Sequence, residues 1–322
     1  MKNQPPGIRQ RCPICNQSGK YSYTGKDLLH GIPGEFIYAE CMSCGAIYQA
    51  PMPKPDQIAS FYPDQYDPYR PGKAKKRNFL EKSVLRTTYD YYHLDSILPD
   101  WIGKQAGMFA YRDSIPFTEN GRLLDIGCGG GKFLLSMQQL GWQAEGLEFN
   151  KGAVQTCRQS GLKVFHGELS GASYVDNSFD VVTARHVIEH IADPSSFLAE
   201  IYRVLKPGGI MVLKTPNSHA LGRKWFGTNW FPNDVPRHLI LYSPVNLRLL
   251  AEKHGFCEKN IQTFSTPKCI LNSWDYLRGS QQGRPSKKCK WRRILARFYV
   301  AAANFIDRGD EIFAIYEKPL RS

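Results

Sequence analysis

LLDIGCGGG, residues 123–131, is the stretch that decides the fold. It runs from an apolar strand pattern into a glycine-rich turn, and the residues after it have a helical pattern. Gly127 and Gly129 would let the backbone approach a ligand closely, and the following helix would direct free amide groups toward it. Glu148 ends the next apolar segment, where a carboxylate can accept two hydrogen bonds from a ribose diol. The pattern predicts a site for a ribose-bearing ligand.

The rest of this region alternates between strand-like and helix-like segments. Apolar runs such as RLLDIG, QAEGLEF and FDVVTARH alternate with amphipathic stretches such as KFLLSMQQLG and PSSFLAEIYRVLKPGG. Strands that alternate with helices form right-handed βαβ units, which give a parallel sheet with its ligand at the carboxyl ends of the strands. The sequence therefore predicts an α/β, Rossmann-like fold.

With these segments in place, the region between residues 120 and 260 resembles the class I S-adenosylmethionine-dependent methyltransferases. The first motif of that family is similar to DIGCGGG at residues 125–131, and its adenine-side segment is similar to HGEL at residues 166–169. SFDVV at residues 178–182 resembles its fourth strand, and LKPGG at residues 205–209 resembles the turn before its fifth strand. The resemblance implies a seven-stranded methyltransferase fold, an enzyme of this class, and S-adenosylmethionine as its cofactor.

The resemblance also implies which residues hold the cofactor. In the family, the acidic residue that matches Asp125 lies by the methionine end or organises the loop, and the one that matches Glu148 binds the ribose. Glu168 stands at the adenine-contact position, where aspartate is more usual. The set that the resemblance implies is Asp125, Gly127, Cys128, Gly129, Glu148, Phe149, Glu168, Leu169 and Arg185. An NAD-binding Rossmann protein is the alternative, but the glycine spacing departs from G-x-G-x-x-G.

HVIEH, residues 186–190, follows the predicted fourth strand, where the methyltransferase active site opens. It also fits the H-x-x-E-H pattern of inverted zinc peptidases, but it follows a strand end and precedes Asp193-Pro194 instead of lying inside a long helix. Many small-molecule O-methyltransferases, including those of ubiquinone biosynthesis, have a similar Glu-His pair, which in some of them holds a divalent ion or positions the substrate. The simpler alternative for Glu189 and His190 is that His190 only bonds loop backbone.

An aromatic and basic insert, residues 217–240, follows the predicted fifth strand. Its large aromatic residues, which would stack on a planar or sugar ring, are Trp225, Trp230 and Phe231. Arg237 would hold an anionic group, and His238 would remove a hydroxyl proton. The alternative is that the aromatic residues are lid core and that His238 caps or packs. The predicted catalytic set is His238, His190, His186 and Arg237.

Four cysteines form two Cys-x-x-Cys pairs, Cys12 with Cys15 and Cys41 with Cys44. Two such knuckles supply the four thiolates that tetrahedral zinc prefers, so the sequence predicts a zinc ribbon. A site with four protein ligands has no open coordination position, which makes this Zn²⁺ structural. Two unrelated redox or structural pairs are the alternative.

Three parts are predicted along the chain: a zinc-ribbon module at 1–50, a Pro/Tyr-rich connector with a helical cover at 51–115, and the methyltransferase domain at 116–322. Within the cover, residues 73–110 have helical apolar spacing and are predicted to form a helix. Residues 284–306 form a basic amphipathic segment that would lie on anionic lipid, bind nucleic acid or be an ordinary solvated helix. Residues 311–319 are predicted as a terminal strand.

Bulk composition limits the partners and the location. The chain has 322 residues, of which 42% are hydrophobic, and a net charge of +13. That charge favours an anionic partner such as nucleic acid, a phosphorylated or nucleotide-linked small molecule, or an anionic membrane surface. The first residues have no apolar signal region, so we expect a cytoplasmic protein, with peripheral contact at the inner face of the membrane through residues 284–306.

The predicted function is O-methylation of a small molecule or glycan precursor, with an anionic or lipid-linked acceptor among the candidates. An RNA methyltransferase is the first alternative, but the span from Cys12 to Cys44 is not notably basic and the chain has no Asn/Asp-Pro-Pro-Tyr/Phe motif. A non-catalytic S-adenosylmethionine-binding or scaffold protein is the alternative from another class. The intact Asp125, Gly127 and Glu148 disfavour it.

Overall fold

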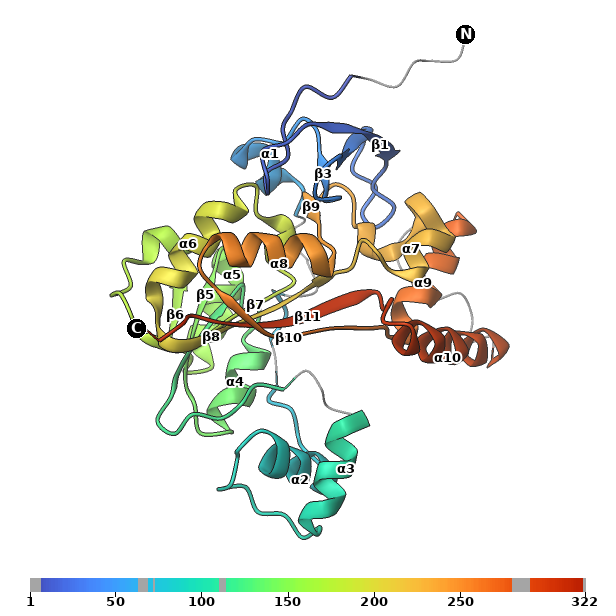
Figure 1. The fold of residues 1–322 in the computed structure, drawn as a ribbon. Coiled ribbons are helices and arrows are strands. Elements are labelled where there is room, and N and C mark those ends of the chain that lie inside the picture. Colours follow the sequence, from blue (N-terminus) through green and yellow to red (C-terminus); the bar gives the residue numbers. More distant parts are fainter. Residues whose placement is uncertain (1–6, 63–68, 72, 110–113, 280–289, 321–322) are drawn as a thin grey trace. The chain divides into compact units, whose positions relative to one another are not determined.

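The structure is a computed structural model that describes residues 7–62, 69–71, 73–109, 114–279 and 290–320 (Figure 1). The chain divides into two compact units, each made of separate stretches of sequence. The unit called here the cysteine unit combines Met1–Asp64, Arg185–Tyr202 and Leu213–Glu317. The glycine unit combines Gln65–Ala184, Arg203–Val212 and Lys318–Ser322. The domain boundaries at residues 50 and 115 stay predictions.

The main sheet has seven strands in the order β10-β11-β8-β7-β4-β5-β6. Their bounds are β4 Arg122–Ile126, β5 Gln143–Glu148, β6 Val164–His166, β7 Phe179–Arg185, β8 Leu205–Pro216, β10 Cys257–Phe264 and β11 Glu311–Glu317. β4 pairs in parallel with both β5 and β7, and β5 with β6, whereas β10 is antiparallel to β11. From β4, the chain adds β5 and β6 on one side of the sheet and later adds β7 on the other side. This switch point, at the carboxyl ends of β4 and β7, is where sheets of this kind bind ligands. The predicted seven-stranded methyltransferase fold is confirmed.

Local signals explain the first βα units. Residues 123–126 of β4 are buried, as in a strand that is covered on both faces. Helix α4, Lys132–Gln138, begins directly after Gly131, whose φ of +76° favours glycine. Helix α5, Lys151–Gln159, is capped by the Asn150 side chain, which accepts a hydrogen bond from the Ala153 amide. The glycine loop is therefore held between a buried strand and a helix start.

β8 begins earlier than the sequence predicts, because it includes the stretch that the family resemblance assigns to a turn. The Gly208 amide donates to the Lys318 carbonyl at 2.7 Å, and the Lys318 amide donates to the Gly209 carbonyl at 2.9 Å. These paired backbone bonds extend the strand back to Leu205.

Two helices, α2 Phe79–Thr88 and α3 Asp100–Phe109, occupy the stretch where the sequence predicts one. Asn78 caps α2 by accepting from the Glu81 amide at 2.8 Å. The chain turns at Asp90, with φ of +63°, before α3 begins. A Cβ on Gly103 would lie 2.5 Å from Ser83 Oγ, so the helices pack closely at this glycine. The turn between them outweighs the continuous apolar periodicity that suggested a single helix.

A second sheet, β1-β2-β3-β9, forms in the cysteine unit. Its strands are β1 Gly19–Gly25, β2 Phe36–Cys41, β3 Ile47–Gln49 and β9 Ile240–Leu241, and helix α1, Pro55–Ser60, follows β3. β9 begins at Ile240, the last residue of the predicted insert, and pairs antiparallel with β3. A small core of Tyr38, Ile47, Val235 and Leu241 packs these strands together. The end of the insert is thus a strand of the cysteine-rich module, which the sequence did not indicate.

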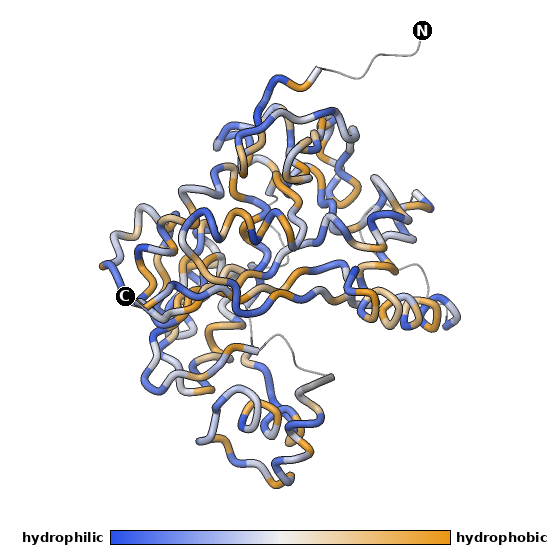
Figure 2. The backbone as a smooth tube through the Cα atoms, viewed as in Figure 1, coloured by the Kyte–Doolittle hydropathy of each residue, from blue (hydrophilic) through white to orange (hydrophobic). Residues whose placement is uncertain are grey.

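The remaining elements are α6 Pro194–Val204, α7 Leu221–Phe226, α8 Pro244–Lys253, α9 Pro267–Leu277, α10 Lys290–Phe305 and the short 3₁₀ helices η2 Leu169–Ala172, η3 Ile188–His190, η4 Gly227–Asn229 and η5 Phe231–Asn233. A buried core joins residues of α7, α9 and α10 around Trp230. Orange and blue alternate along α10 in Figure 2, as the predicted amphipathic pattern requires. Within the described ranges, no helix combines the length and apolar content that crossing a bilayer requires.

Candidate active site

The glycine loop and Glu148 lie at the carboxyl ends of β4 and β5. Gly127 and Gly129 have φ values of +69° and +52°, which favour glycine. The Gly129 amide donates to Glu148 Oε2 and the Asn150 amide to Oε1, both at 2.8 Å. A carboxylate has about four acceptor sites, so Glu148 can still accept from a ribose diol. The loop and the carboxylate fit a nucleoside.

Asp125 is the penultimate residue of β4, just before the glycine loop, and is 1% exposed. Thr183 of the neighbouring β7 stands directly opposite it in the ladder and donates its hydroxyl to Asp125 Oδ1 at 2.5 Å. This buried position suits the loop-organising role among the two that the resemblance implies.

The other predicted cofactor residues differ in exposure. Cys128 and Leu169 are buried, whereas the Phe149 side chain is 61% exposed and Glu168 is also exposed. An exposed ring and an exposed carboxylate beside β5 and β6 are free to face an adenine. Arg185 is the last residue of β7 and belongs to the cysteine unit, unlike the rest of the set.

The backbone of residues 69–71 also lies at the glycine loop. A Cβ on Gly130 would come within 1.8 Å of the Arg70 carbonyl oxygen, so only glycine permits this approach. Burial, with the charge of Glu148, raises the pKa of Tyr69 to about 12. Tyr69 therefore lies near the Glu148 carboxylate. Sequence analysis missed it, and its only signal was the tyrosine-rich connector.

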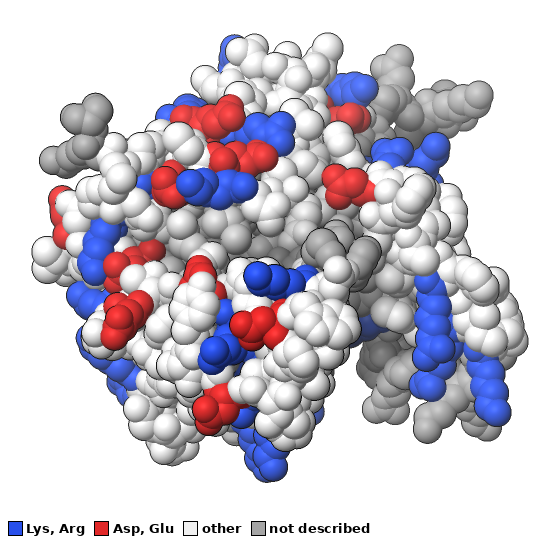
Figure 3. All heavy atoms as spheres, turned by 60° about the horizontal axis from the view of Figure 1, so that its bottom comes forward, with Lys and Arg blue, Asp and Glu red and all other residues white. Residues whose placement is uncertain are grey.

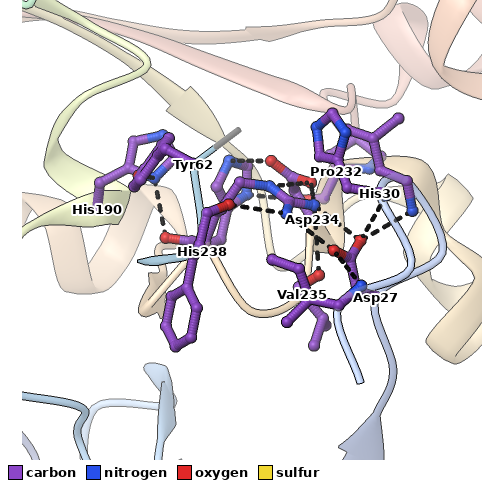
Figure 4. Close-up of polar contacts among 12 residues, drawn as sticks. Asp27, His30, Tyr62, His190, Pro232, Asp234, Val235 and His238 are labelled. Atoms are coloured by element: carbon purple, nitrogen blue, oxygen red, sulfur yellow. Dashed lines mark hydrogen bonds and ion pairs between the residues drawn. The ribbon is translucent and has the colours of Figure 1, made fainter. Parts of the chain in front are cut away.

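His238 is the centre of a separate group of polar side chains, which lies within the cysteine unit (Figure 4). Its Nδ1 lies 2.8 Å from the Pro232 carbonyl oxygen. Because a carbonyl only accepts, Nδ1 carries the proton and Nε2 of the neutral ring has the lone pair. Nε2 lies 3.9 Å from Glu189 Oε1 and 3.8 Å from Asp234 Oδ2. Burial and the nearby His190 lower the pKa of His238 to about 4.

His190 packs edge-on against His238, with ring centroids 4.8 Å apart. Its Nδ1 donates to the Arg237 carbonyl oxygen at 2.9 Å, and the Tyr62 hydroxyl lies 2.8 Å from the same nitrogen. His190 therefore does bond loop backbone, and that bond leaves its Nε2 unprotonated in the neutral ring.

Glu189 is fully buried between histidines. Thr215 donates its hydroxyl to Glu189 Oε2 at 2.9 Å, and His186 Nδ1 lies 3.4 Å from Oε1. Burial opposes ionisation, but the hydrogen bond from His186 and the histidine charges lower the pKa of Glu189 to about 2. The group is thus an anion that can stabilise a protonated His238.

His186 is the most exposed of the predicted catalytic residues, with a side chain that is 42% exposed. Its backbone φ is +56°, an unusual value for this residue type. Its Nε2 lies 3.4 Å from Glu311 Oε1. A carboxylate therefore lies beside each ring nitrogen of His186. His186 contacts Glu189, and Glu189 in turn lies near His238.

Arg237 has partners that its predicted role did not include. Its guanidinium is fully buried and pairs with Asp27 at 3.0 Å and with Asp234 at 2.7 Å. Hydrogen bonds from Arg237 outweigh the burial of Asp27 and lower the pKa of that carboxyl. Because the two carboxylates occupy the guanidinium, it is not presented to an anionic acceptor.

The three predicted stacking residues differ in burial. Trp230 is 1% exposed and donates its indole N–H to Asp310 Oδ1 at 2.8 Å. It belongs to the α7–α9–α10 core, so the lid-core alternative describes it better than ring stacking does. Trp225 is 59% exposed and Phe231 partly exposed, which leaves these two able to contact a ligand.

Two groups of side chains could hold metal ions in the part of the chain that the structure describes. Cys12 Sγ lies 3.6 Å from Cys44 Sγ, and Cys15 Sγ lies 3.4 Å from Cys41 Sγ. Tetrahedral zinc with bonds of about 2.3 Å separates its sulfurs by about 3.8 Å, so the four thiols fit that ion. Glu189, His190 and His238 offer the other group, with ligand atoms within 4.8 Å of one another.

Among the comparisons with known proteins, the family match includes the glycine loop and the histidine segment. A family model described as "Methyltransferase domain" matches residues 105–257. The ubiquinone biosynthesis O-methyltransferase of Cereibacter sphaeroides is 34% identical over 171 residues, which are 48% of this chain and 69% of that protein. The protein of the same name from Maricaulis maris is 32% identical over 154 residues, 44% of this chain and 60% of its own length. The match thus spans less than two thirds of the second protein.

Among solved structures, an S-adenosylmethionine-dependent methyltransferase from Archaeoglobus fulgidus covers 62% of this chain and 86% of its own. It is 22% identical, with a TM-score of 0.44. The fold assignment therefore rests on the strand order above and not on this likeness.

Proposed function

The chain belongs to the class I S-adenosylmethionine-dependent methyltransferases, and from that premise we propose that it methylates an oxygen atom of a small molecule. The relatives named above are O-methyltransferases by name, which supports oxygen as the acceptor atom. The observation that carries the proposal is a buried, neutral histidine whose unprotonated nitrogen faces two carboxylates.

The cofactor would be held by the glycine unit. Amides and space at Gly127 and Gly129 suit its methionine end, Glu148 suits the ribose, and Phe149 with Glu168 suits the adenine. Bound S-adenosylmethionine supplies a methyl group on a sulfonium, which is already a potent donor. The protein's tasks are therefore to align the acceptor and to remove its proton.

His238 is the base in this proposal. The Pro232 carbonyl fixes the tautomer, so Nε2 is the atom that takes the hydroxyl proton. Glu189 and Asp234 then stabilise the imidazolium that forms. His190 and His186 orient this group through the Arg237 carbonyl and Glu189. If the Glu189–His190–His238 group binds a divalent ion instead, its two imidazoles favour Zn²⁺ or Fe²⁺, and methyl transfer would require that ion to be added.

Two classes of methyl acceptor are weighed against the charge and the exposed aromatic residues of the chain. A glycan or sugar precursor, including a nucleotide-linked or lipid-linked one, agrees with the net charge of +13, with the exposed ring of Trp225 and with the partly exposed ring of Phe231. RNA is the second candidate. Over the left and centre of Figure 3, Lys and Arg are interspersed with Asp and Glu, and only the right side shows Lys and Arg alone, whereas a nucleic-acid site favours a continuous basic stripe.

The four-cysteine group would hold a structural Zn²⁺. Besides the sulfur spacing, the Ile14 amide donates to Cys12 Sγ and the Cys44 amide to Cys41 Sγ, as expected when backbone amides surround bound thiolates. All four ligand positions are occupied by protein, so this ion has no place for a substrate.

Peripheral contact with anionic lipid is the proposed role of α10; residues 284–289 of the predicted segment lie outside the described residues. The buried face of the helix consists of Arg292, Ala296, Tyr299 and Ala303. Trp291, Phe298 and Phe305 are 53%, 68% and 90% exposed, and the helix contains no acidic residue. Exposed apolar side chains flanked by cations are typical of interfacial helices. Co-sedimentation with phosphatidylglycerol vesicles, and its loss in Phe298→Ala, would test this.

The experiment for methyl transfer follows label from methyl-labelled S-adenosylmethionine to a panel of acceptors. The panel contains a catechol, a nucleotide-linked sugar, a lipid-linked sugar and a short RNA. We expect label in one of the first three, at an ether oxygen located by mass spectrometry, and none in RNA. Label only in RNA, or on nitrogen or carbon, would contradict the proposal.

A further inference from the structure

We infer that the four-cysteine module positions the base of the reaction, and that Asp27 is the positioning residue through which it does so. The inference rests on the proposed role of His238. Asp27 lies in the loop after β1, between the two cysteine pairs in the chain, and it is joined to His238 through Arg237 and Asp234 (Figure 4). It does not contact the histidine itself.

Asp27 is itself held in place by its own loop. Its Oδ1 accepts from the amides of Leu29 and His30 at 2.9 and 3.0 Å, and its Oδ2 accepts from the Ile32 amide at 3.2 Å. The side chain is fully buried. A carboxylate with three backbone donors has one available orientation, and that orientation is set by the cysteine-rich module.

Arg237 links Asp27 to Asp234. Its two terminal nitrogens donate to the two oxygens of Asp27 at 3.1 and 3.0 Å, in a bidentate pair. Its Nε and one terminal nitrogen also donate to Asp234 Oδ1 at 3.1 and 2.7 Å. The guanidinium therefore fixes Asp234 relative to Asp27.

Charge gives Asp27 a second effect on the base. Two carboxylates share one guanidinium, so Asp234 is only partly neutralised by Arg237. Its other oxygen, Oδ2, lies 3.8 Å from His238 Nε2, where an anion stabilises the imidazolium. Without the charge of Asp27, Arg237 would neutralise Asp234 more completely.

The same module also holds the backbone of the histidine. The Tyr38 hydroxyl of β2 donates to the His238 carbonyl at 2.8 Å, and the Gln49 amide of β3 donates to the Leu239 carbonyl at 2.8 Å. The next two residues of the chain, Ile240 and Leu241, form strand β9 and pair with β3. Side chain and backbone of the base are thus both tied to the segment that the four cysteines close.

Stability alone does not account for this arrangement. A buried ion pair is often no more stabilising than apolar residues of the same volume, because its charges lose their hydration. The Arg237–Asp27 pair instead orients Asp234, whose Oδ2 lies beside the His238 lone pair.

The test uses the full-length, zinc-loaded chain and the variant Asp27→Asn, which keeps the shape and removes the charge. We expect kcat to fall at least tenfold, a part of the ~10²–10⁴ that a general base contributes, with the Kd for S-adenosylmethionine within about twofold of wild type. Nitrogen-15 NMR of His238, assigned with His238→Ala, is expected to show the Nδ1–H tautomer in both proteins, because the Pro232 carbonyl sets it, and a shifted Nε2 resonance in the variant, because Asp234 then moves relative to Nε2. The NMR readout needs no acceptor.

Glu35→Gln is the matched control, because Glu35 forms an exposed pair with Lys26 at 3.1 Å in the same loop. It should change neither readout. Unchanged kcat and His238 resonances in Asp27→Asn would overturn the inference, while an inactive His238→Ala would leave the proposed function intact. Full activity in His238→Ala would instead remove the proposed base. If Asp27→Asn does not fold, Arg237→Lys decides, because lysine keeps the charge but cannot make the bidentate pair, and full kcat with an unchanged Nε2 resonance in that variant would overturn the inference.

Discussion

The glycine loop and the histidine cluster are built in opposite ways. The loop joins residues 127–131 to Glu148 and Asn150 within consecutive βα units, mostly through backbone amides. The cluster joins side chains from Asp27, Glu189 and His238, which are far apart in the sequence, through the buried Asp27–Arg237 ion pair and through contacts between histidines and carboxylates. A local motif can therefore define the first, whereas only the tertiary structure defines the second. Changes to the cluster should affect turnover, and changes to the loop should affect cofactor affinity.

The largest effect is expected for His238→Ala. Loss of the base should lower kcat by roughly 10²- to 10⁴-fold, because proton removal from the acceptor hydroxyl loses its assistance. The Kd for S-adenosylmethionine, measured by calorimetry, should stay within about twofold. A parallel loss of cofactor affinity would erase the contrast between the two regions.

The next effect is on stability. Arg237→Met leaves Asp27 and Asp234 buried without their cation, and should lower the free energy of unfolding by about 3–5 kcal/mol in urea denaturation. Arg248→Met removes the partly exposed pair with Glu258 and serves as the control, with a loss of at most about 1 kcal/mol. Equal losses would show that the Arg237 pairs are ordinary surface contacts in energetic terms.

A smaller effect is expected at the loop. Glu148→Ala removes the acceptor of the Gly129 and Asn150 amides and of the ribose, and should weaken S-adenosylmethionine binding by roughly 10- to 100-fold. Glu145→Ala, on the same strand but paired with Arg122 and Lys163, should bind normally. Unchanged affinity in Glu148→Ala would remove the cofactor assignment.

The pH dependence should show the smallest change near neutrality. Burial and His190 lower the pKa of His238 to about 4, while Glu189 and Asp234 act in the opposite direction. A lowered pKa keeps the base unprotonated as the pH falls through 6.5, so kcat should hold to about pH 5 and drop near 4. A kcat profile that falls around pH 6.5 would mean that an unperturbed histidine is the base.

The sequence predicted what local pattern determines. The α/β fold and the glycine loop followed from the alternation of apolar strands with helices and from LLDIGCGGG, because each of these patterns can be recognised within short stretches of chain. The spacing of the two Cys-x-x-Cys pairs likewise brought four sulfurs together.

Features that depend on distant partners were missed or misjudged. From the sequence, Arg237 was predicted to bind an anionic group, but in the structure it pairs with Asp27. Trp230 was predicted to stack on a ligand ring, but it is buried and donates its N–H to Asp310. The end of the insert could not be recognised as strand β9, because its partner β3 is nearly two hundred residues earlier in the chain. Burial and pairing across such separations have no signature in a single sequence.

The most direct test of the account is a calorimetric titration of the purified protein with S-adenosylmethionine and S-adenosylhomocysteine, with zinc measured on the same sample. We expect both ligands to bind at one site, with about one zinc per chain. A folded, zinc-loaded protein that binds neither ligand would contradict the account and would make a scaffold role the one to pursue.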